Sequence, residues 1–107
     1  MARSVRVFYS GLQGRSRHNF NWGPINHKSA VIITAAEFHW PGGLGGLDGI
    51  RPFLGQANVW VTNVGVHGAE GGGAGGVEFH THVDWPSPLN VMVTITVLDD
   101  IEEYVRI

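Results

Sequence analysis

Residues 77–85 alternate between two kinds of side chain, and this alternation constrains the fold more than any other feature of the sequence. One set of positions holds Val77, Phe79, Thr81, Val83 and Trp85. The positions between them hold charged residues and histidines. Because successive side chains of a β-strand point to opposite faces of the sheet, we predict a strand with one buried and one solvated face.

Other segments show related patterns. Residues 90–98 alternate in the same way, and the apolar, β-branched segment 29–38 predicts a buried central strand. Residues 57–66 alternate as far as Asn63, where the phase shifts as a β-bulge requires. Each of these segments is therefore predicted to be a strand.

Shorter strands are expected over 5–7 and 18–22, and residues 101–107 are expected to add a last strand at a sheet edge. Loops are expected over 11–17 and over 40–53, the second being rich in Gly and Pro. No segment shows a convincing helical periodicity. The predicted fold class is all-β, an antiparallel β-sandwich of about six to seven short strands.

A glycine-rich run occupies residues 71–76. It lacks the Lys-Ser/Thr ending of a phosphate-binding loop, and a predicted strand follows it where such a loop needs a helix. We therefore interpret this glycine-rich loop as a flexible connection between strands.

Length and composition limit the number of domains, the kinds of partner and the location that we expect for this protein. The chain has 107 residues, of which 43% are apolar and 15% charged, so a single folded domain over 1–107 is expected. A formal net charge of −2 argues against nucleic acid as a partner. No cysteine is present, and no apolar run is long enough for a membrane span or a signal peptide. The expected location is cytoplasmic, or outside the cell after release without a conventional signal.

The polar face of the 77–85 strand carries two imidazoles and two carboxylates: Glu78, His80, His82 and Asp84. A His-x-His pair on a strand can bind a divalent cation such as Zn²⁺ or Ca²⁺ when a third ligand comes from a neighbouring segment. His39 and His67 are the candidates for that third ligand. The alternative is an ordinary solvated face, which also explains the carboxylates.

A second polar group lies on the outward face of the 57–66 strand, where Trp60 stands between Asn58 and Thr62. An indole can cover the apolar face of a sugar ring while neighbouring amide and hydroxyl groups bind the sugar hydroxyls. The alternative is a Trp60 that is buried at a subunit interface or under the glycine-rich loop. The other three tryptophans stand beside Gly or Pro and are assigned to the core or to turns: Trp22, Trp40 and Trp85.

Nucleophilic catalysis finds no support in the sequence. No serine lies in a nucleophile-elbow context. The pair Asp99-Asp100 follows a predicted strand and is interpreted as a turn cap or a solvated pair. A protein that is not an enzyme is therefore favoured, although histidines and carboxylates are plentiful.

Three features follow one another in the C-terminal half: a Val-rich strand over 58–64 with a Gly-containing connection, Gly76-Val77-Glu78-Phe79 opening a strand, and a strand over 91–98. This order resembles that of H-type lectin domains. The resemblance implies a six-stranded antiparallel sandwich, trimeric association and binding of simple sugars between neighbouring subunits. It assigns no sugar-contacting residue in this chain.

Three hypotheses follow. The first is a non-catalytic binding module, lectin-like and carbohydrate-recognising, that acts as a homo-oligomer and presents either Trp60 or the His80/His82 face to a glycan. The second is a structural subunit of a particle or appendage, in which those faces lie against neighbouring copies. The third is a metal-binding β domain that uses the His-x-His strand. Arginines early in the chain and carboxylates near its end could also favour pairing between chains, or could be scattered surface charge.

Overall fold

The computed structural model describes residues 2–41, 46–68 and 73–107. The strands within these residues are β1 (Arg3–Leu12), β2 (Gly14–Asn21), β3 (Ser29–Glu37), β4 (Asn58–His67), β5 (Gly76–Asp84) and β6 (Leu89–Asp100). One short 3₁₀ helix, η1 (Leu47–Gly49), lies in the connection between β3 and β4.

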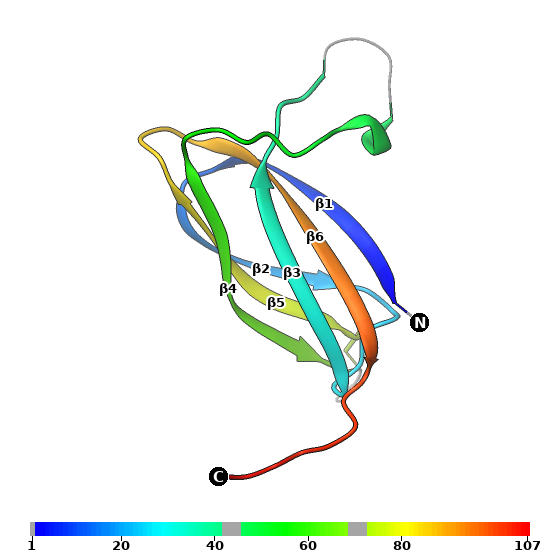
Figure 1. The fold of residues 1–107 in the computed structure, drawn as a ribbon. Coiled ribbons are helices and arrows are strands. Elements are labelled where there is room, and N and C mark those ends of the chain that lie inside the picture. Colours follow the sequence, from blue (N-terminus) through cyan, green and yellow to red (C-terminus); the bar gives the residue numbers. More distant parts are fainter. Residues whose placement is uncertain (1, 42–45, 69–72) are drawn as a thin grey trace.

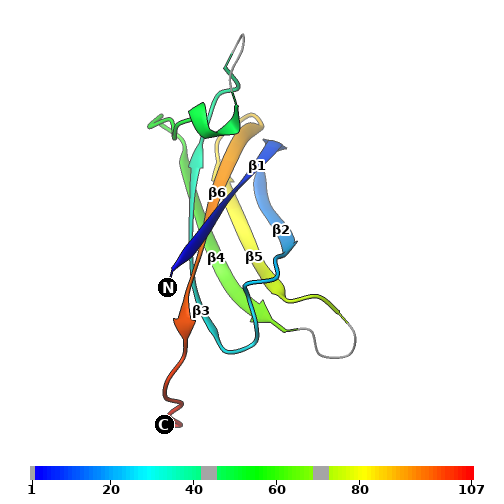
Figure 2. The ribbon, with the colours of Figure 1, turned by 90° about the vertical axis from the view of Figure 1, so that its right-hand side faces the viewer.

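The strands form two antiparallel sheets, one with the order β1-β6-β3 and the other with the order β2-β5-β4. Figures 1 and 2 show the two sheets packed face to face, which confirms the predicted β-sandwich. None of the helices in the described part of the chain is long and apolar enough to cross a membrane.

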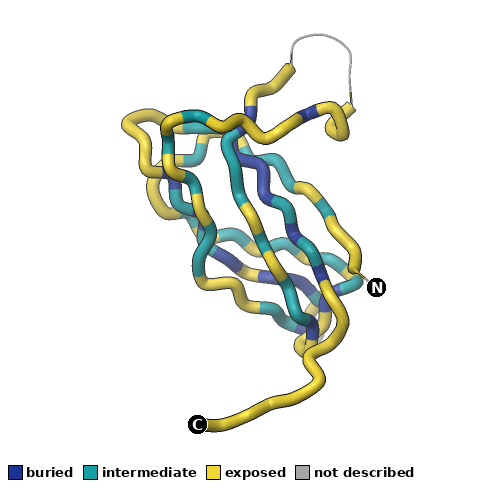
Figure 3. The backbone as a smooth tube through the Cα atoms, in the orientation of Figure 1, coloured by how far each residue is buried: buried dark blue, intermediate teal, exposed yellow. Residues whose placement is uncertain are grey.

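The core lies between the sheets and is built mainly by the two central strands, β5 and β6. The alternation predicted for both strands is confirmed, because every second residue is buried over 77–83 and over 91–97, and Figure 3 colours these positions along the backbone. The buried apolar residues of these strands are Val77, Phe79, Val83, Val91, Val93, Ile95 and Val97.

The prediction that 29–38 forms a central strand is wrong, since β3 lies at the edge of its sheet. The central place belongs to β6, which pairs with β1 on one side and with β3 on the other. The strand is also not buried on both faces, since Ile32 on the outer face of β3 is 56% exposed. An apolar run shows that a segment suits a sheet, but the order of strands depends on long-range pairing that such a run does not specify.

Residues 101–107 do not form the predicted edge strand. β6 ends at Asp100, and the segment continues in an irregular, fully exposed course away from the sandwich (Figure 1). Its first residue, Ile101, donates its backbone N–H to the carbonyl of Lys28. Among the described strands none pairs with the later residues, which lead away from both sheets in Figure 1.

The predicted loop at 11–17 is much shorter than expected, because β2 already begins at Gly14. The chain changes sheets at this corner, and Gly11 and Gly14 both adopt the left-handed conformation, with φ of 70° and 64°. Glycine takes that conformation without the steric cost that other residues meet.

The connection between β4 and β5 includes residues 69–72, so part of the predicted flexible loop lies outside the described residues. The last two residues of the glycine-rich loop, Gly75 and Gly76, are closely packed. A side chain on Gly75 or Gly76 would collide with the backbone carbonyl of Ile25 or of Phe20 respectively. These two glycines therefore allow a close backbone approach.

The predicted long loop at 40–53 is confirmed in the residues that the structure describes, whereas residues 42–45 lie outside them. The later part of this loop covers the outer face of the β1-β6-β3 sheet at one end. Ile50 packs there against Phe38 and Met92, which lie on that face and are buried. The loop then returns to β3, where Phe53 forms an isolated bridge to Glu37.

Candidate functional site

The two polar groups singled out in the sequence lie side by side on the outer face of the β2-β5-β4 sheet. The strand register places Thr62 opposite His80, Trp60 opposite His82 and Asn58 opposite Asp84. On the other side of β5, Arg15 lies opposite His82, and Arg17 lies opposite His80. We call this surface the polar face; it consists of Arg15, Arg17, Asn19, Asn58, Trp60, Thr62, Glu78, His80, His82 and Asp84.

Trp60 and His82 contact each other on the polar face. Their rings are stacked nearly parallel, with an interplanar angle of 3° and centroids 4.9 Å apart. Nε2 of His82 is hydrogen-bonded to Oγ1 of Thr62 at 2.6 Å, which holds the imidazole in this position. Trp60 is nevertheless 44% exposed. Of the two alternatives for Trp60, cover by the glycine-rich loop does not occur in the described residues, and burial at a subunit interface stays a hypothesis.

The charges on the polar face balance. Arg17 forms an ion pair with Glu78, with 3.1 Å between Nη2 and Oε2. Arg15 and Asp84 add one further charge of each sign on the same face. Such a face has many hydrogen-bonding groups but no dominant charge, and this favours a neutral polar ligand over an ion.

A shallow hollow of about 350 Å³ lies at the end of the polar face where β2 and β4 finish. Its lining includes Asn19, Asn21, His67 and Glu78. His67 reaches this face because of the bulge in β4, and its Nε2 is hydrogen-bonded to Oδ1 of Asn19 at 2.7 Å. Asn19 in turn donates to Oδ1 of Asn21 at 2.9 Å. The hollow is therefore lined by amide, imidazole and carboxylate groups.

The proposed metal ligands do not converge. Among the described residues, no group of three or more His, Cys, Asp or Glu side chains is placed to hold a metal ion. The rings of His80 and His82 are 6.4 Å apart at an angle of 74°. Both candidates for the third ligand have other partners, since His39 is bonded to Glu37 and His67 to Asn19.

His18 lies behind the polar face, on the inner side of β2. It is hydrogen-bonded through Nε2 to Oγ1 of the buried Thr81 at 2.8 Å. The rings of Tyr9 and Phe79 lie on either side, with centroids 4.3 and 5.2 Å away. Burial lowers the pKa of His18 below its ordinary value of 6.5, and the neighbouring His80 lowers the pKa further.

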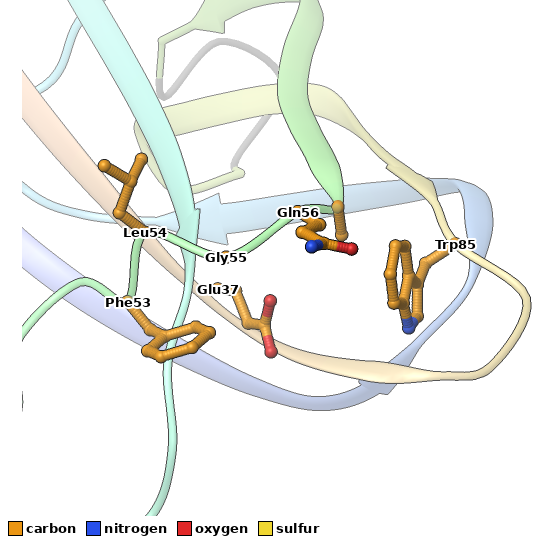
Figure 4. A pocket seen from close by; sticks show the side chains of 7 residues that line it. Glu37, Phe53, Leu54, Gly55, Gln56 and Trp85 are labelled. Atoms are coloured by element: carbon orange, nitrogen blue, oxygen red, sulfur yellow. The ribbon is translucent and has the colours of Figure 1, made fainter.

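A second candidate site lies at one end of the sandwich, and sequence reasoning missed it. We call it the end pocket; it is lined by Glu37, Phe53, Leu54, Gly55, Gln56, Ala57 and Trp85. Its volume is about 440 Å³. Figure 4 shows the Glu37 carboxylate between the Phe53 ring and the Trp85 indole. Trp85 and Trp40, assigned to the core or to turns, are in fact 38% and 48% exposed.

Local sequence carries little trace of the end pocket, because its main residues come from three distant segments. The one available signal was a carboxylate, Glu37, near the end of an apolar strand. Charged side chains are rarely buried without a function or a partner, and the partner of Glu37 is His39.

Comparison with known proteins finds no matching family model, no matching curated protein and no matching solved structure. The resemblance to H-type lectin domains therefore remains one of the order of features along the sequence.

Proposed function

We propose that the protein is a non-catalytic binding module that takes a neutral carbohydrate on its polar face. The observation that carries this proposal is the register of β4 on β5, which brings a half-exposed indole next to two rows of hydrogen-bonding side chains. Sugar rings need an apolar surface for their C–H groups and polar neighbours for their hydroxyls.

The details of the group around Trp60 support a preformed site. His82 covers one side of the indole and is itself held by Thr62, so the ring has lost much of its freedom before a ligand arrives. Pre-organisation of this kind lowers the entropic cost of binding. Asn58 and Asp84 lie beside Trp60 and can exchange hydrogen bonds with hydroxyl groups.

The test is retention on an array of immobilised neutral oligosaccharides, with wild type and Trp60→Ala measured side by side. We expect the variant to bind any retained glycan about tenfold or more weakly, which corresponds to about 1.4 kcal/mol. Trp60 is on an exposed sheet face, so the variant should keep its fold, as circular dichroism can verify.

Trp85→Ala is the matched control, since it removes another half-exposed indole that follows β5 and lines the end pocket instead of the polar face. It should leave glycan retention unchanged. Retention of no glycan by wild type, or equal weakening by both variants, would overturn the proposal.

A second function, assembly with further copies of the chain, is favoured by residues 101–107. Tyr104, Val105 and Ile107 are exposed there and belong to none of the described strands. Apolar side chains on an extended segment are suited to packing against a neighbouring subunit. A homo-oligomer is compatible with glycan binding, because the polar face and this segment are separate surfaces.

A further inference from the structure

We propose that the end pocket binds the protonated amino group of an organic ligand, with the Glu37 carboxylate as its acceptor and Phe53 and Trp85 beside its apolar part. The site is distinct from the polar face. It requires a ligand with one ammonium group and a hydrocarbon or aromatic body.

Backbone contacts build the pocket. Phe53 donates its N–H to the carbonyl of Glu37 at 2.7 Å, which places the aromatic ring beside the carboxylate. Gly55 permits this arrangement, because a Cβ atom there would lie 2.7 Å from Cε2 of Phe53 and 3.0 Å from Oε1 of Glu37. On the other wall, Gln13 donates to the backbone carbonyl of Pro86 at 3.0 Å and so supports the turn that carries Trp85.

The Glu37 carboxylate is largely removed from solvent and only partly satisfied. Its side chain is 13% exposed. In the described part of the chain its hydrogen-bond partner is His39, whose Nε2 donates to Oε2 at 3.2 Å. A carboxylate can accept several hydrogen bonds, and His39 supplies one of them. A cationic ligand would add further donors to the same carboxylate.

The walls of the pocket also favour a cation. Phe53 and Trp85 contribute aromatic rings to the lining, and such rings attract ammonium groups. The ring of His39 also lies close to that of Phe53, with centroids 4.2 Å apart. In the described part of the chain the lining residues include no lysine or arginine, and the group paired with Glu37 is the imidazole of His39. At about 440 Å³ the pocket has room for a small aralkyl amine. Because an N–H group can donate to the carboxylate, a primary ammonium is favoured over a quaternary one.

The experiment is a titration of the full chain with 2-phenylethylammonium, followed through the indole N–H resonances in ¹H–¹⁵N spectra. The resonance of Trp85 is identified by its loss in Trp85→Phe. We expect this resonance to shift and saturate at millimolar ligand, whereas the resonance of Trp60 stays in place. The neutral analogue 2-phenylethanol should shift it far less.

The key variant is Glu37→Gln, which keeps the shape of the side chain and its bond to His39 but removes the charge. It should weaken amine binding about tenfold or more, as expected for the loss of a charge-assisted hydrogen bond. Gly55→Ala, which displaces the Phe53 ring, should weaken it independently. Equal binding of amine and alcohol, no effect of Glu37→Gln, or no saturable shift with any amine would each overturn the proposal.

The source of the amine is distinguished by a second probe, Nα-acetyl-lysine methylamide. Binding of both probes would indicate a lysine side chain of a partner protein as the ligand, and binding of the free amine alone would indicate a small molecule. Glu37→Gln should not change glycan retention. Failure of this proposal can therefore be told apart from failure of the polar face.

Discussion

His18 shows how one polar residue is accommodated next to the core. Its imidazole lies between Tyr9 and Phe79 and reaches the hydroxyl of Thr81, which has no exposed surface of its own. The hydrogen bond satisfies both groups, whereas a proton added to the ring would place a charge between aromatic side chains and near His80. The neutral ring is therefore the form that fits the fold.

This arrangement predicts a pH dependence of stability. The pKa of His18 is below 6.5 in the folded chain and close to 6.5 in the unfolded chain, so the unfolded chain binds the proton more readily. The contribution of His18 is present in full above pH 6.5 and declines as the pH falls through the lowered folded-state pKa. Urea unfolding at a series of pH values should show this loss.

His18→Gln is the control, because an amide can still bond to Thr81 but does not titrate. The variant should have a flatter stability profile below pH 6.5 than wild type, whatever its absolute stability. Identical slopes for the two proteins would show that His18 does not cause the pH dependence.

At the scale of elements, the bulge in β4 decides which residues reach the polar face. The register changes between Thr62 and Gly65, so β4 has one more residue than β5 over this stretch. Asn63 takes the left-handed conformation with φ of 57°. After the bulge Val66 pairs with buried Val77 and packs against the core. Without the extra residue the two faces of the following segment would exchange.

Asn63→Val tests this role. A β-branched residue is strained in the left-handed region, so we expect a loss of about 1–2 kcal/mol in the free energy of unfolding. Asn63→Gly keeps the bulge and should be close to wild type. Chemical denaturation of the three proteins gives the comparison, and a Val variant as stable as the Gly variant would contradict the expectation.

At the scale of the whole molecule, the sandwich leaves one segment without a partner. Residues 101–107 extend away from both sheets (Figure 1), and the backbone bond from Ile101 to Lys28 joins their start to the fold. Burial of Val105 and Ile107 therefore requires another surface. A second copy of the chain is the partner that the assembly hypothesis supplies.

Deletion of residues 101–107 should leave the free energy of unfolding within about 0.5 kcal/mol of the full chain, because the segment contributes little to the core. Light scattering should show the full chain as a closed oligomer and the shortened chain as a smaller species. Val105→Asp, which keeps the length, should act in the same direction. A full chain that stays monomeric at every concentration would exclude assembly through this segment.

The fold class and the faces of the main strands could be predicted because they depend on local periodicity. The alternation predicted over 77–85 is confirmed as far as Asp84, where β5 ends before the exposed Trp85, and the phase shift at Asn63 is confirmed in β4. The polar groups around Trp60 and His82 were recognised separately, since the sequence holds no signal for the register that joins them. The end pocket could not be predicted, because Glu37, Phe53 and Trp85 meet only through long-range pairing.

The sequence by itself determined that the chain forms strands, which side chains alternate, and where β4 needs a bulge, because each of these depends on neighbours within a few residues. Only the tertiary structure decided that β3 is an edge strand and that residues 101–107 leave the sheet. It also decided that His39 is hydrogen-bonded to Glu37 and His67 to Asn19, and not to a shared metal with His80 and His82. Strand order and side-chain partners depend on free-energy differences between distant contacts, and no local pattern encodes those differences.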